Sequence, residues 1–347
     1  DDTQRFSFSD YVSGRYLRRN VRAITSKRSI WLPIVGLSMF WAVSQVVLAA
    51  FPAHAKDLLG ETNTVVIQGL LACSGLGIIL GAVLAGRISR NYIELGLIPV
   101  GALGLAVALM LLRVFDTHFA LAFGFIAMGF FGGVFIVPLN SMIQYHAEDK
   151  HLGTVLAGNN WVQNLTMLAF LVLTAVFATL GLPSAGLLTM IALVAVAGAA
   201  YTVWMLPHSL TRILASALIK RAYHIDVVGF TNLPKEGGVL LLGNHASWID
   251  WALVQIACPR PVRFVMLRSI YNRWYLKPLF KQFGAIPISG GSSREALQEI
   301  NEYLKAGEVV CLFPEGAITK TGQLGKFQSG YQRATEGAAG VIVPVSY

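Results

Sequence analysis

His245 and Asp250 are the residues whose types and spacing best suit acid–base chemistry, and they follow an apolar run that predicts a strand over 238–243. Five residues along a regular helix would turn the two side chains about 140° apart. A hydrogen bond between them therefore requires His245 to lie just before a helix, predicted over 247–257, with Asp250 reaching back. In that geometry Asp250 would fix the imidazole tautomer, and His245 would take a proton from an attacking hydroxyl.

The turn around this histidine offers no nucleophile of the enzyme's own. Ser247 lies two residues after His245, where a serine is expected to cap the following helix. Asn244 and Ser247 are both candidates for contact with a substrate, because side chains on a turn between a strand and a helix are exposed.

A second polar group follows another apolar run, 309–313, and consists of Glu315 and Gly316 in the sequence Phe-Pro-Glu-Gly. This turn offers a carboxylate and backbone N–H groups. The carboxyl ends of parallel strands meet at one edge of a sheet. We therefore expect Glu315 to lie in the same crevice as His245.

From Tyr223 onward, short apolar runs alternate with amphipathic stretches, a pattern typical of an α/β domain. A capping box at Ser292 and Glu295 and a terminating Gly307 bound one of the predicted helices. Strands are predicted at 223–230, 238–243, 262–267, 285–288, 309–313 and 341–345. Helices are predicted at 247–257, 270–283, 293–306 and 328–337.

The composition places the rest of the chain in a membrane. Of its 347 residues, 55% are hydrophobic and only 13% are charged, with a net charge of +9, whereas about a quarter of the residues of a soluble domain are charged. Apolar runs that are long enough to cross a bilayer all lie in the first part of the chain, at about 30–51, 63–86, 94–115, 118–139, 155–180 and 185–206. We expect a basic flank (1–28), six spans (29–207) and a separate C-terminal domain (208–347).

The basic residues of the short flanking segments set the orientation, because Lys and Arg resist translocation. One side would carry ten of them and the other two, so both ends of the membrane region are expected in the cytoplasm, together with the C-terminal domain. The ten are Arg5, Arg15, Arg18, Arg19, Arg22, Lys27, Arg28, Arg87, Arg90 and Lys150, and the two are Lys56 and Arg113.

Uncharged polar side chains are the notable feature inside the predicted spans. Asn159, Asn160, Gln163 and Asn164 gather on one side of a helix. They could form a polar lining for a lipid headgroup, or they could bond helices to one another. Gly77 and Gly81 have the spacing of close-packing glycines.

The six spans, the basic flank and the short loop Gly-Arg-Ile-Ser-Arg (86–90) resemble the C-terminal half of a major facilitator superfamily transporter. The stretch 138–144, with the polar start of the fifth span, resembles the lysophospholipid transporter branch of that superfamily. Transporters of this kind rock two six-helix halves around a central site. The resemblance therefore implies a missing N-terminal half.

The C-terminal domain resembles the glycerolipid acyltransferase family over about 125 residues, with four blocks in order. The block 313–324 is most similar to the bifunctional 2-acylglycerophosphoethanolamine acyltransferase/acyl-carrier-protein synthetases. The resemblance implies that His245 is the general base and Asp250 its partner, and that Glu315 and Gly316 bind the acyl acceptor. The four blocks are Asn244 to Asp250, Gly284 to Ser289, Phe313 to Gly316 and Val341 to Val345.

The sequence departs from the family at two phosphate-binding cations. Family members that use a small phosphate acceptor have an arginine where this chain has about Gly290, and Thr-Arg where it has Ala317-Ile318. A phosphodiester headgroup such as ethanolamine is therefore expected, although Arg294 or Lys320 could replace the missing cations.

Basic and aromatic residues alternate between Asp250 and Glu295, with no acid among them. Three interpretations stay open: docking on anionic lipid, which the membrane spans favour, an ordinary solvated face, or a dock for an acidic carrier protein. Nucleic-acid binding is disfavoured beside six spans. The residues are Arg260, Arg263, Arg268, Arg273, Lys277, Lys281 and Arg294, with Phe264, Tyr271, Trp274, Tyr275, Phe280 and Phe283.

Together these features predict a multi-pass protein of the bacterial inner membrane that transfers an acyl group from acyl-carrier protein or acyl-CoA to the free hydroxyl of a lysophospholipid, coupled to lysophospholipid transport. The alternative is a lysophospholipid transporter or flippase with an inactive acyltransferase domain. No bound cofactor, metal or disulfide is expected, because Cys73, Cys258 and Cys311 have no paired spacing. A C-terminal adenylating domain is expected beyond residue 347.

Overall fold

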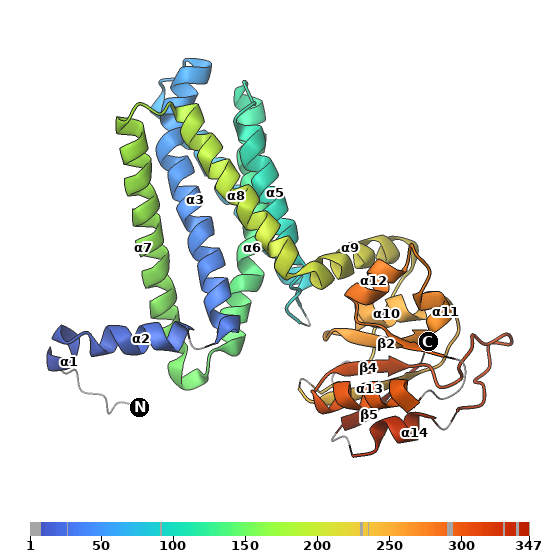
Figure 1. Ribbon diagram of the computed structural model, residues 1–347. Helices are drawn as coiled ribbons and strands as arrows, with labels where there is room; N and C mark the ends of the chain where they lie inside the picture. The colour runs from blue at the N-terminus through green and yellow to red at the C-terminus, as the bar shows by residue number, and fades with distance from the viewer. Residues whose placement is uncertain are drawn as a thin grey trace. The chain divides into compact units, whose positions relative to one another are not determined.

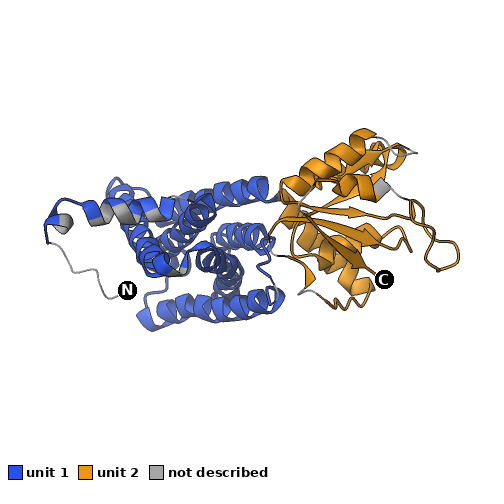
Figure 2. Ribbon diagram, turned by 90° about the horizontal axis from the view of Figure 1, so that it is seen from below, with its two compact units in different colours: residues 1–206 blue, residues 207–347 orange. Residues whose placement is uncertain are grey.

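The computed structural model describes residues 8–25, 27–90, 92–229, 232–234, 236–289, 294–328, 330–337 and 340–346. The chain divides into two compact units, residues 1–206 and 207–347 (Figure 2). The first unit is helical, and the second is an α/β unit (Figure 1).

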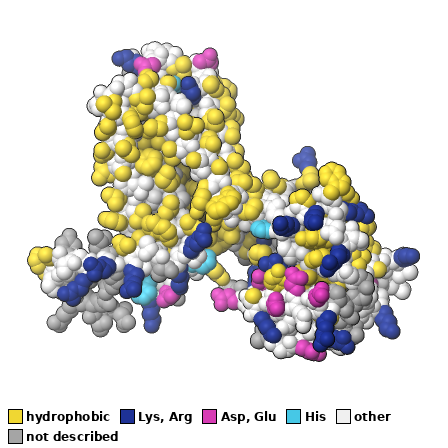
Figure 3. Space-filling view, in the orientation of Figure 1, with side chains coloured by type: hydrophobic (Ala, Val, Ile, Leu, Met, Phe, Trp, Pro, Cys, Tyr) yellow, Lys and Arg dark blue, Asp and Glu magenta, His cyan; other side chains and the backbone are white. Residues whose placement is uncertain are grey.

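The helical unit contains long antiparallel helices with short connections (Figure 1). Its outer flank is covered by apolar side chains, and its charged side chains gather at the two ends (Figure 3). Its helices are α1 (Phe8–Val12), α2 (Arg15–Thr25), α3 (Arg28–Leu59), α4 (Thr64–Ile88), α5 (Leu97–Leu112), α6 (His118–His146), η1 (Asp149–His151), α7 (Leu152–Thr179) and α8 (Ser184–Met205).

Five of these helices are long and apolar enough to cross a membrane: α3, α4, α6, α7 and α8. They confirm five of the six predicted spans. The predicted span 94–115 contains α5, which is apolar but only 16 residues long. A helix of that length measures about 24 Å, less than the roughly 30 Å hydrocarbon core. The sixth span therefore stays a prediction.

Glycine lets α4 and α6 pack backbone against backbone. Gly77 and Gly81 on α4 are buried, and a side-chain carbon at either would collide with the backbone of α6. Gly129 and Gly133 on α6 meet α4 in the same way. The prediction that Gly77 and Gly81 serve close packing is confirmed.

The α/β unit is built on a five-stranded parallel sheet with strand order β3-β2-β4-β1-β5. In register, Leu241 lies beside Cys311 of β4 on one side and Val343 of β5 on the other. The strands are β1 (Gly238–Gly243), β2 (Val262–Leu267), β3 (Ile286–Ile288), β4 (Val309–Leu312) and β5 (Gly340–Val345).

Helices cover both faces of this sheet because successive side chains of a buried strand point to opposite faces. Leu240 and Val310 pack with the apolar side of α13, whereas Val239 and Leu241 pack with Val254 of α10. The helices are α9 (Pro207–Ala222), α10 (Asp250–Ala257), α11 (Arg268–Tyr271), α12 (Lys277–Gln282), α13 (Arg294–Lys305) and α14 (Gly330–Thr335).

Two element predictions are wrong. Residues 223–229 form no strand, although their sequence alternates apolar and polar side chains, because a strand also needs a neighbouring backbone and β5 occupies the place beside β1. The predicted helix 270–283 is divided into α11 and α12. Residues 230 and 290–293, including Ser292 of the capping box, lie outside the described residues, whereas Gly307 ends α13 at a φ of 82° as predicted.

Substituting Gly81 with alanine should destabilise the helical unit, because the added methyl group collides with the carbonyl of Phe130. Overpacking of this kind costs about 1–3 kcal/mol. We expect a lower midpoint of thermal unfolding in detergent, followed by fluorescence-detected size exclusion. The matched control is Gly69→Ala on the same helix, where the methyl group meets open space. Equal midpoints for the two variants would contradict this account of the α4–α6 contact.

Candidate active site

The site lies where the connections of the sheet change direction. After β1 the chain crosses by α10 to β2, and after β4 it crosses by α14 on the opposite face to β5. Since β1 and β4 are neighbours, the connections that follow them leave toward opposite faces of the sheet, and this point is the usual place of a ligand site in an open α/β sheet. His245 follows β1 there, and Glu315 follows β4.

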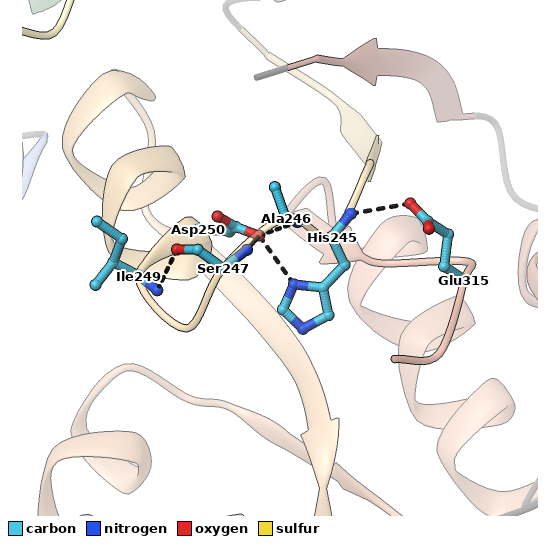
Figure 4. Close-up of polar contacts among 6 residues, drawn as sticks. All are labelled: His245, Ala246, Ser247, Ile249, Asp250 and Glu315. Atoms are coloured by element: carbon cyan, nitrogen blue, oxygen red, sulfur yellow. Dashed lines mark hydrogen bonds and ion pairs between the residues drawn. The ribbon is translucent and has the colours of Figure 1, made fainter. Parts of the chain in front are cut away.

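His245 and Asp250 form the hydrogen bond that was expected if His245 lies just before the helix. The distance from His245 Nδ1 to Asp250 Oδ2 is 2.9 Å, and α10 begins at Asp250 (Figure 4). An ionised carboxylate accepts but does not donate, so Nδ1 carries a proton, and in the neutral imidazole Nε2 then has the lone pair. The side chain of Asp250 is only 2% exposed, whereas that of His245 is 23% exposed. The ring can therefore meet a substrate while its partner is shielded from water.

The same carboxylate oxygen shapes the turn. Oδ2 of Asp250 also accepts the backbone N–H groups of Ala246, at 2.7 Å, and Ser247, at 2.8 Å. The prediction that Ser247 caps the helix is wrong: its hydroxyl accepts the N–H of Ile249 within the turn, and the helix begins one residue later (Figure 4). Asp250 binds the amides that precede its own helix, so it orients both the turn and the imidazole.

Glu315 joins the two strand ends. Its Oε1 accepts the backbone N–H of His245 at 3.0 Å, and its Oε2 accepts that of Gly325 at 2.9 Å. The N–H of Thr319 bonds to the carbonyl of His245 at 2.8 Å, so the segment after β4 is bonded to the histidine at two points. This geometry makes Glu315 a positioning residue. Its predicted contact with an acyl acceptor stays a prediction.

Two glycines beside the Glu315 carboxylate cannot be replaced by larger residues without strain. Gly316 has a φ of 73°, which strains any residue with a side chain, and a side-chain carbon there would press on Gln328. A side-chain carbon at Gly325 would meet the carboxylate of Glu315. The loop therefore depends on small residues where it approaches the acidic side chain.

Phe313 is a site residue that the sequence did not reveal. Its ring stacks on that of His245, with the centroids 4.4 Å apart and the planes 16° apart. Its position directly before Pro314, at the end of a predicted strand, was a signal in the sequence. The contact with His245 could not be inferred from it, because that requires knowing that β1 and β4 are neighbours. The stacking leaves the imidazole edge available and limits its rotation.

The buried cysteines do not supply a nucleophile. Burial raises the pKa of the thiols of Cys258 and Cys311, so neither is a thiolate at neutral pH. Among the described residues no group of three His, Cys, Asp or Glu side chains gathers as a metal site.

The candidate headgroup cations belong to two different segments, and no contact joins them among the described residues. Arg294 is exposed at the first turn of α13, and Lys320 is exposed in the loop after β4. A hollow of about 360 Å³ instead lies at the carboxyl ends of β2 and β3, on the same edge of the sheet as His245. Its lining includes Arg268, a cation that sequence reasoning counted only as one of a basic run. The remaining lining residues are Leu267, Ser269, Asn272, Ile288 and Ser289.

Two of the seven basic residues between Asp250 and Glu295 hold the fold together. Arg260 donates to the carbonyls of Pro234, Gly237 and Gly307, which ties loops at the amino edge of the sheet. Arg263 forms a two-pronged ion pair with Glu308 and lies 4.0 Å from the centroid of the Tyr303 ring. Phe264 and Phe280 are buried. This stretch is therefore only partly a surface for partners.

The four polar residues of α7 form two separate pairs. The Gln163 side chain donates to Asn159, which is buried, at 2.8 Å, whereas Asn164 donates to the carbonyl of Asn160 at 2.8 Å. Asn160 and Asn164 are exposed. The structure thus separates a packed polar pair from an exposed one.

Residues 224–347 match the family model described as Acyltransferase, and they form an acyltransferase domain. Within this domain, the similar proteins include a chloroplastic 1-acyl-sn-glycerol-3-phosphate acyltransferase of Arabidopsis thaliana, 26% identical over 144 residues (40% of each chain). A probable 1-acyl-sn-glycerol-3-phosphate acyltransferase of Mycoplasma pneumoniae is 25% identical over 143 residues, or 39% of this chain and 53% of the relative.

The N-terminal half is homologous to lysophospholipid transporters. The lysophospholipid transporter LplT of Klebsiella pneumoniae is 30% identical over 188 residues, which cover 51% of this chain and 46% of the transporter. The chain spans about half the length of the relatives it matches. No solved structure matches it significantly. The two units thus resemble two different kinds of protein joined in one membrane protein.

Substituting Glu315 with glutamine tests whether its carboxylate holds the loop after β4 against His245. The amide keeps one acceptor but turns an N–H group toward a backbone N–H, and the loss of a charged hydrogen bond is worth about 1.5–3 kcal/mol. We expect the loop after β4 to open more often, so that trypsin cleaves at the exposed Lys320 and Lys326 about tenfold faster. Cleavage is followed by mass spectrometry.

The control for this experiment is Glu302→Gln, at an exposed position of α13. A cleavage rate that is unchanged in Glu315→Gln would show that the carboxylate does not hold the loop.

Proposed function

We propose that this protein acylates lysophospholipids, transferring a fatty acyl group from the thioester of acyl-carrier protein or acyl-CoA to the free glycerol hydroxyl. The observation that carries the proposal is the His245–Asp250 hydrogen bond at the carboxyl ends of the neighbouring strands β1 and β4. A histidine with one nitrogen held by a buried carboxylate and the other unprotonated suits a general base.

The reaction follows from that arrangement. Nε2 of His245 takes the proton of the acceptor hydroxyl while the oxygen attacks the thioester carbonyl. Asp250 stabilises the imidazolium that forms. The tetrahedral intermediate then expels the sulfur, the C–S bond breaks, and the imidazolium proton passes to the thiolate. The products are an ester and a free thiol, and the histidine is again neutral.

The backbone N–H groups of this turn are already used in hydrogen bonds within the protein. The N–H groups of His245, Ala246 and Ser247 are all bonded to carboxylates. These three groups therefore hold the histidine in position, and the donors for the developing oxyanion must come from other groups at this edge of the sheet.

We propose a phospholipid-like acceptor, with 2-acylglycerophosphoethanolamine as the model. Two similar proteins are named for a 1-acyl-glycerol-3-phosphate acceptor, but this chain has Ala317 and Ile318 where the resemblance places a phosphate-binding Thr-Arg pair. The hollow at Arg268 offers one cation with the hydroxyls of Ser269 and Ser289. One cation among neutral donors suits a phosphodiester, which carries a single charge.

The helical unit is proposed to supply this acceptor by transport, because its relatives are named lysophospholipid transporters. We infer that α5 is the sixth span and that the six helices are half of a major facilitator fold. Glu61, before α4, pairs with His118, at the start of α6, at 3.0 Å, and Lys27, before α3, pairs with Glu148, after α6, at 2.9 Å. An even number of crossings must separate the members of each pair, and the number is even only if α5 crosses.

This topology supports an assignment of both ends of the helical unit to the cytoplasmic side of a bacterial inner membrane, as the basic flanks predict. The active site would then meet acyl-carrier protein or acyl-CoA on the side where these donors occur. An uptake path that ends on the same side would give the enzyme its acceptor.

Substituting His245 with alanine should lower acyl transfer by about 10²–10⁴-fold, the usual contribution of a general base. Membranes containing the full chain are supplied with a lysophospholipid and a labelled acyl donor of either type, and the diacyl product is measured. The control is His224→Ala, because His224 is exposed and pairs only loosely with Asp226 at 3.3 Å. Full activity in His245→Ala would overturn the proposal. No activity in the unsubstituted chain with either donor would favour a transporter with an inactive acyltransferase domain.

Replacing both Asn160 and Asn164 with leucine should lower the uptake of labelled lysophospholipid by about tenfold, the value of one or two lost hydrogen bonds. Acylation of a lysophospholipid supplied in detergent should stay unchanged. Leu168→Ala is the matched control, since Leu168 is exposed one turn further along α7. Unchanged uptake in the double variant would remove the exposed pair from the transport path.

A further inference from the structure

We propose that the α/β unit rests on the surface of an anionic bilayer through one defined face, in addition to being linked to the membrane spans. This docking face is formed by α9 and by the segment from the end of α11 through α12. Its members are Leu214, Leu218, Trp274, Tyr275, Lys277 and Lys281.

The exposed side of α9 is apolar where a soluble helix would be polar. Leu214 and Leu218 lie one turn apart and are 58% and 72% exposed. Ala217 and Arg221 lie on the same side and are exposed as well. Lys220 and Arg221 end the helix with positive charge. An apolar stripe with cations at its edge is the pattern of a helix that lies in a membrane interface.

The segment before α12 adds aromatic rings to this charge. Trp274 is 84% exposed and Tyr275 54% exposed, beside the exposed cations Arg273, Lys277 and Lys281. Trp and Tyr favour the headgroup zone of a bilayer, where one part of the ring is apolar and the other meets water. No acidic residue occurs between Asp250 and Glu295 to oppose an anionic surface.

Contacts within the unit hold these two segments together. Gln282, at the end of α12, donates to the hydroxyl of Thr211 on α9 at 2.9 Å. The ring of Phe283 lies 5.8 Å from that of His208, and Phe280 is buried against Trp251 of α10 at 5.8 Å. Helix α12 accordingly lies beside α9 (Figure 1). The docking face is therefore a preformed platform.

Chain continuity identifies the bilayer as the occupant. α8 is a candidate span that ends at Met205, and α9 begins at Pro207, with a single residue between them. A helix that starts directly after a span begins at the membrane surface, and its exposed leucines are stabilised there by contact with lipid. An acidic carrier protein would account for the lysines but not for two exposed leucines and an exposed tryptophan.

The test uses the full chain in lipid nanodiscs. A fluorophore is attached at Leu218→Cys in a Cys73→Ala background, since Cys258 and Cys311 are buried. The quenching of this fluorophore by a nitroxide attached to a lipid is measured in two kinds of nanodisc. One is anionic and contains phosphatidylglycerol with phosphatidylethanolamine, and the other contains phosphatidylcholine alone. Lys305→Cys is the matched control, because Lys305 is exposed on α13, which covers the other face of the sheet.

We expect lipid quenching at position 218 and none at position 305. In the double variant Lys277→Ala/Lys281→Ala, the ratio of the membrane-docked to the undocked α/β unit in the anionic nanodisc should fall. The expected decrease is about fivefold for each lysine removed. Both lysines are exposed, and an unchanged thermal midpoint establishes that the variant is folded. Quenching that is absent at 218 overturns the proposal. If 218 is also shielded from aqueous iodide, a protein surface covers the face instead.

Discussion

Oδ2 of Asp250 accepts three hydrogen bonds, from His245 Nδ1 and from the amides of Ala246 and Ser247, in a position that water hardly reaches. A buried carboxylate is costly unless its lone pairs are satisfied, and here the donors are the groups that a catalytic turn must hold still. The conformation that satisfies the charge is also the conformation that presents Nε2 to a substrate. Removing the acid would therefore disturb the tautomer, the turn and the start of α10 together.

A second carboxylate, that of Glu315, connects the turn after β1 to the segment after the neighbouring strand β4. Glu315 binds the amide of His245 and the amide of Gly325, so the loop after β4 is fixed relative to the turn after β1. Phe313 adds a flat apolar surface under the imidazole. The sheet topology makes this possible, because β1 and β4 are neighbours whose following helices lie on opposite faces.

The sequence alone predicted five strands of the α/β unit to within one residue, since buried parallel strands are short apolar runs bounded by turn residues. The His245–Asp250 bond was also expected, from the position of His245 between a predicted strand and a predicted helix. The order of the strands did not, because local patterns carry no information on which runs pair. For that reason the stacking of Phe313 and the hollow at Arg268 were not foreseen. The strand predicted at 223–230 was wrong for the same reason. Alternating apolar and polar side chains fit a strand, but a strand forms only where a neighbouring backbone can hydrogen-bond to it.

The same limit applied to charge. A run of basic and aromatic residues suggests a surface, yet Arg260 and Arg263 bind carbonyls and Glu308 within the unit, and Phe264 and Phe280 belong to its interior. What stays outside is a smaller group in which cations and exposed rings alternate between α11 and α12. Glu308 neutralises Arg263, and Arg260 binds backbone carbonyls, so neither arginine is available to a partner in the way that the sequence run suggested. The exposed cations beside Trp274 and Tyr275 are therefore the part of the run that can attract an anionic surface.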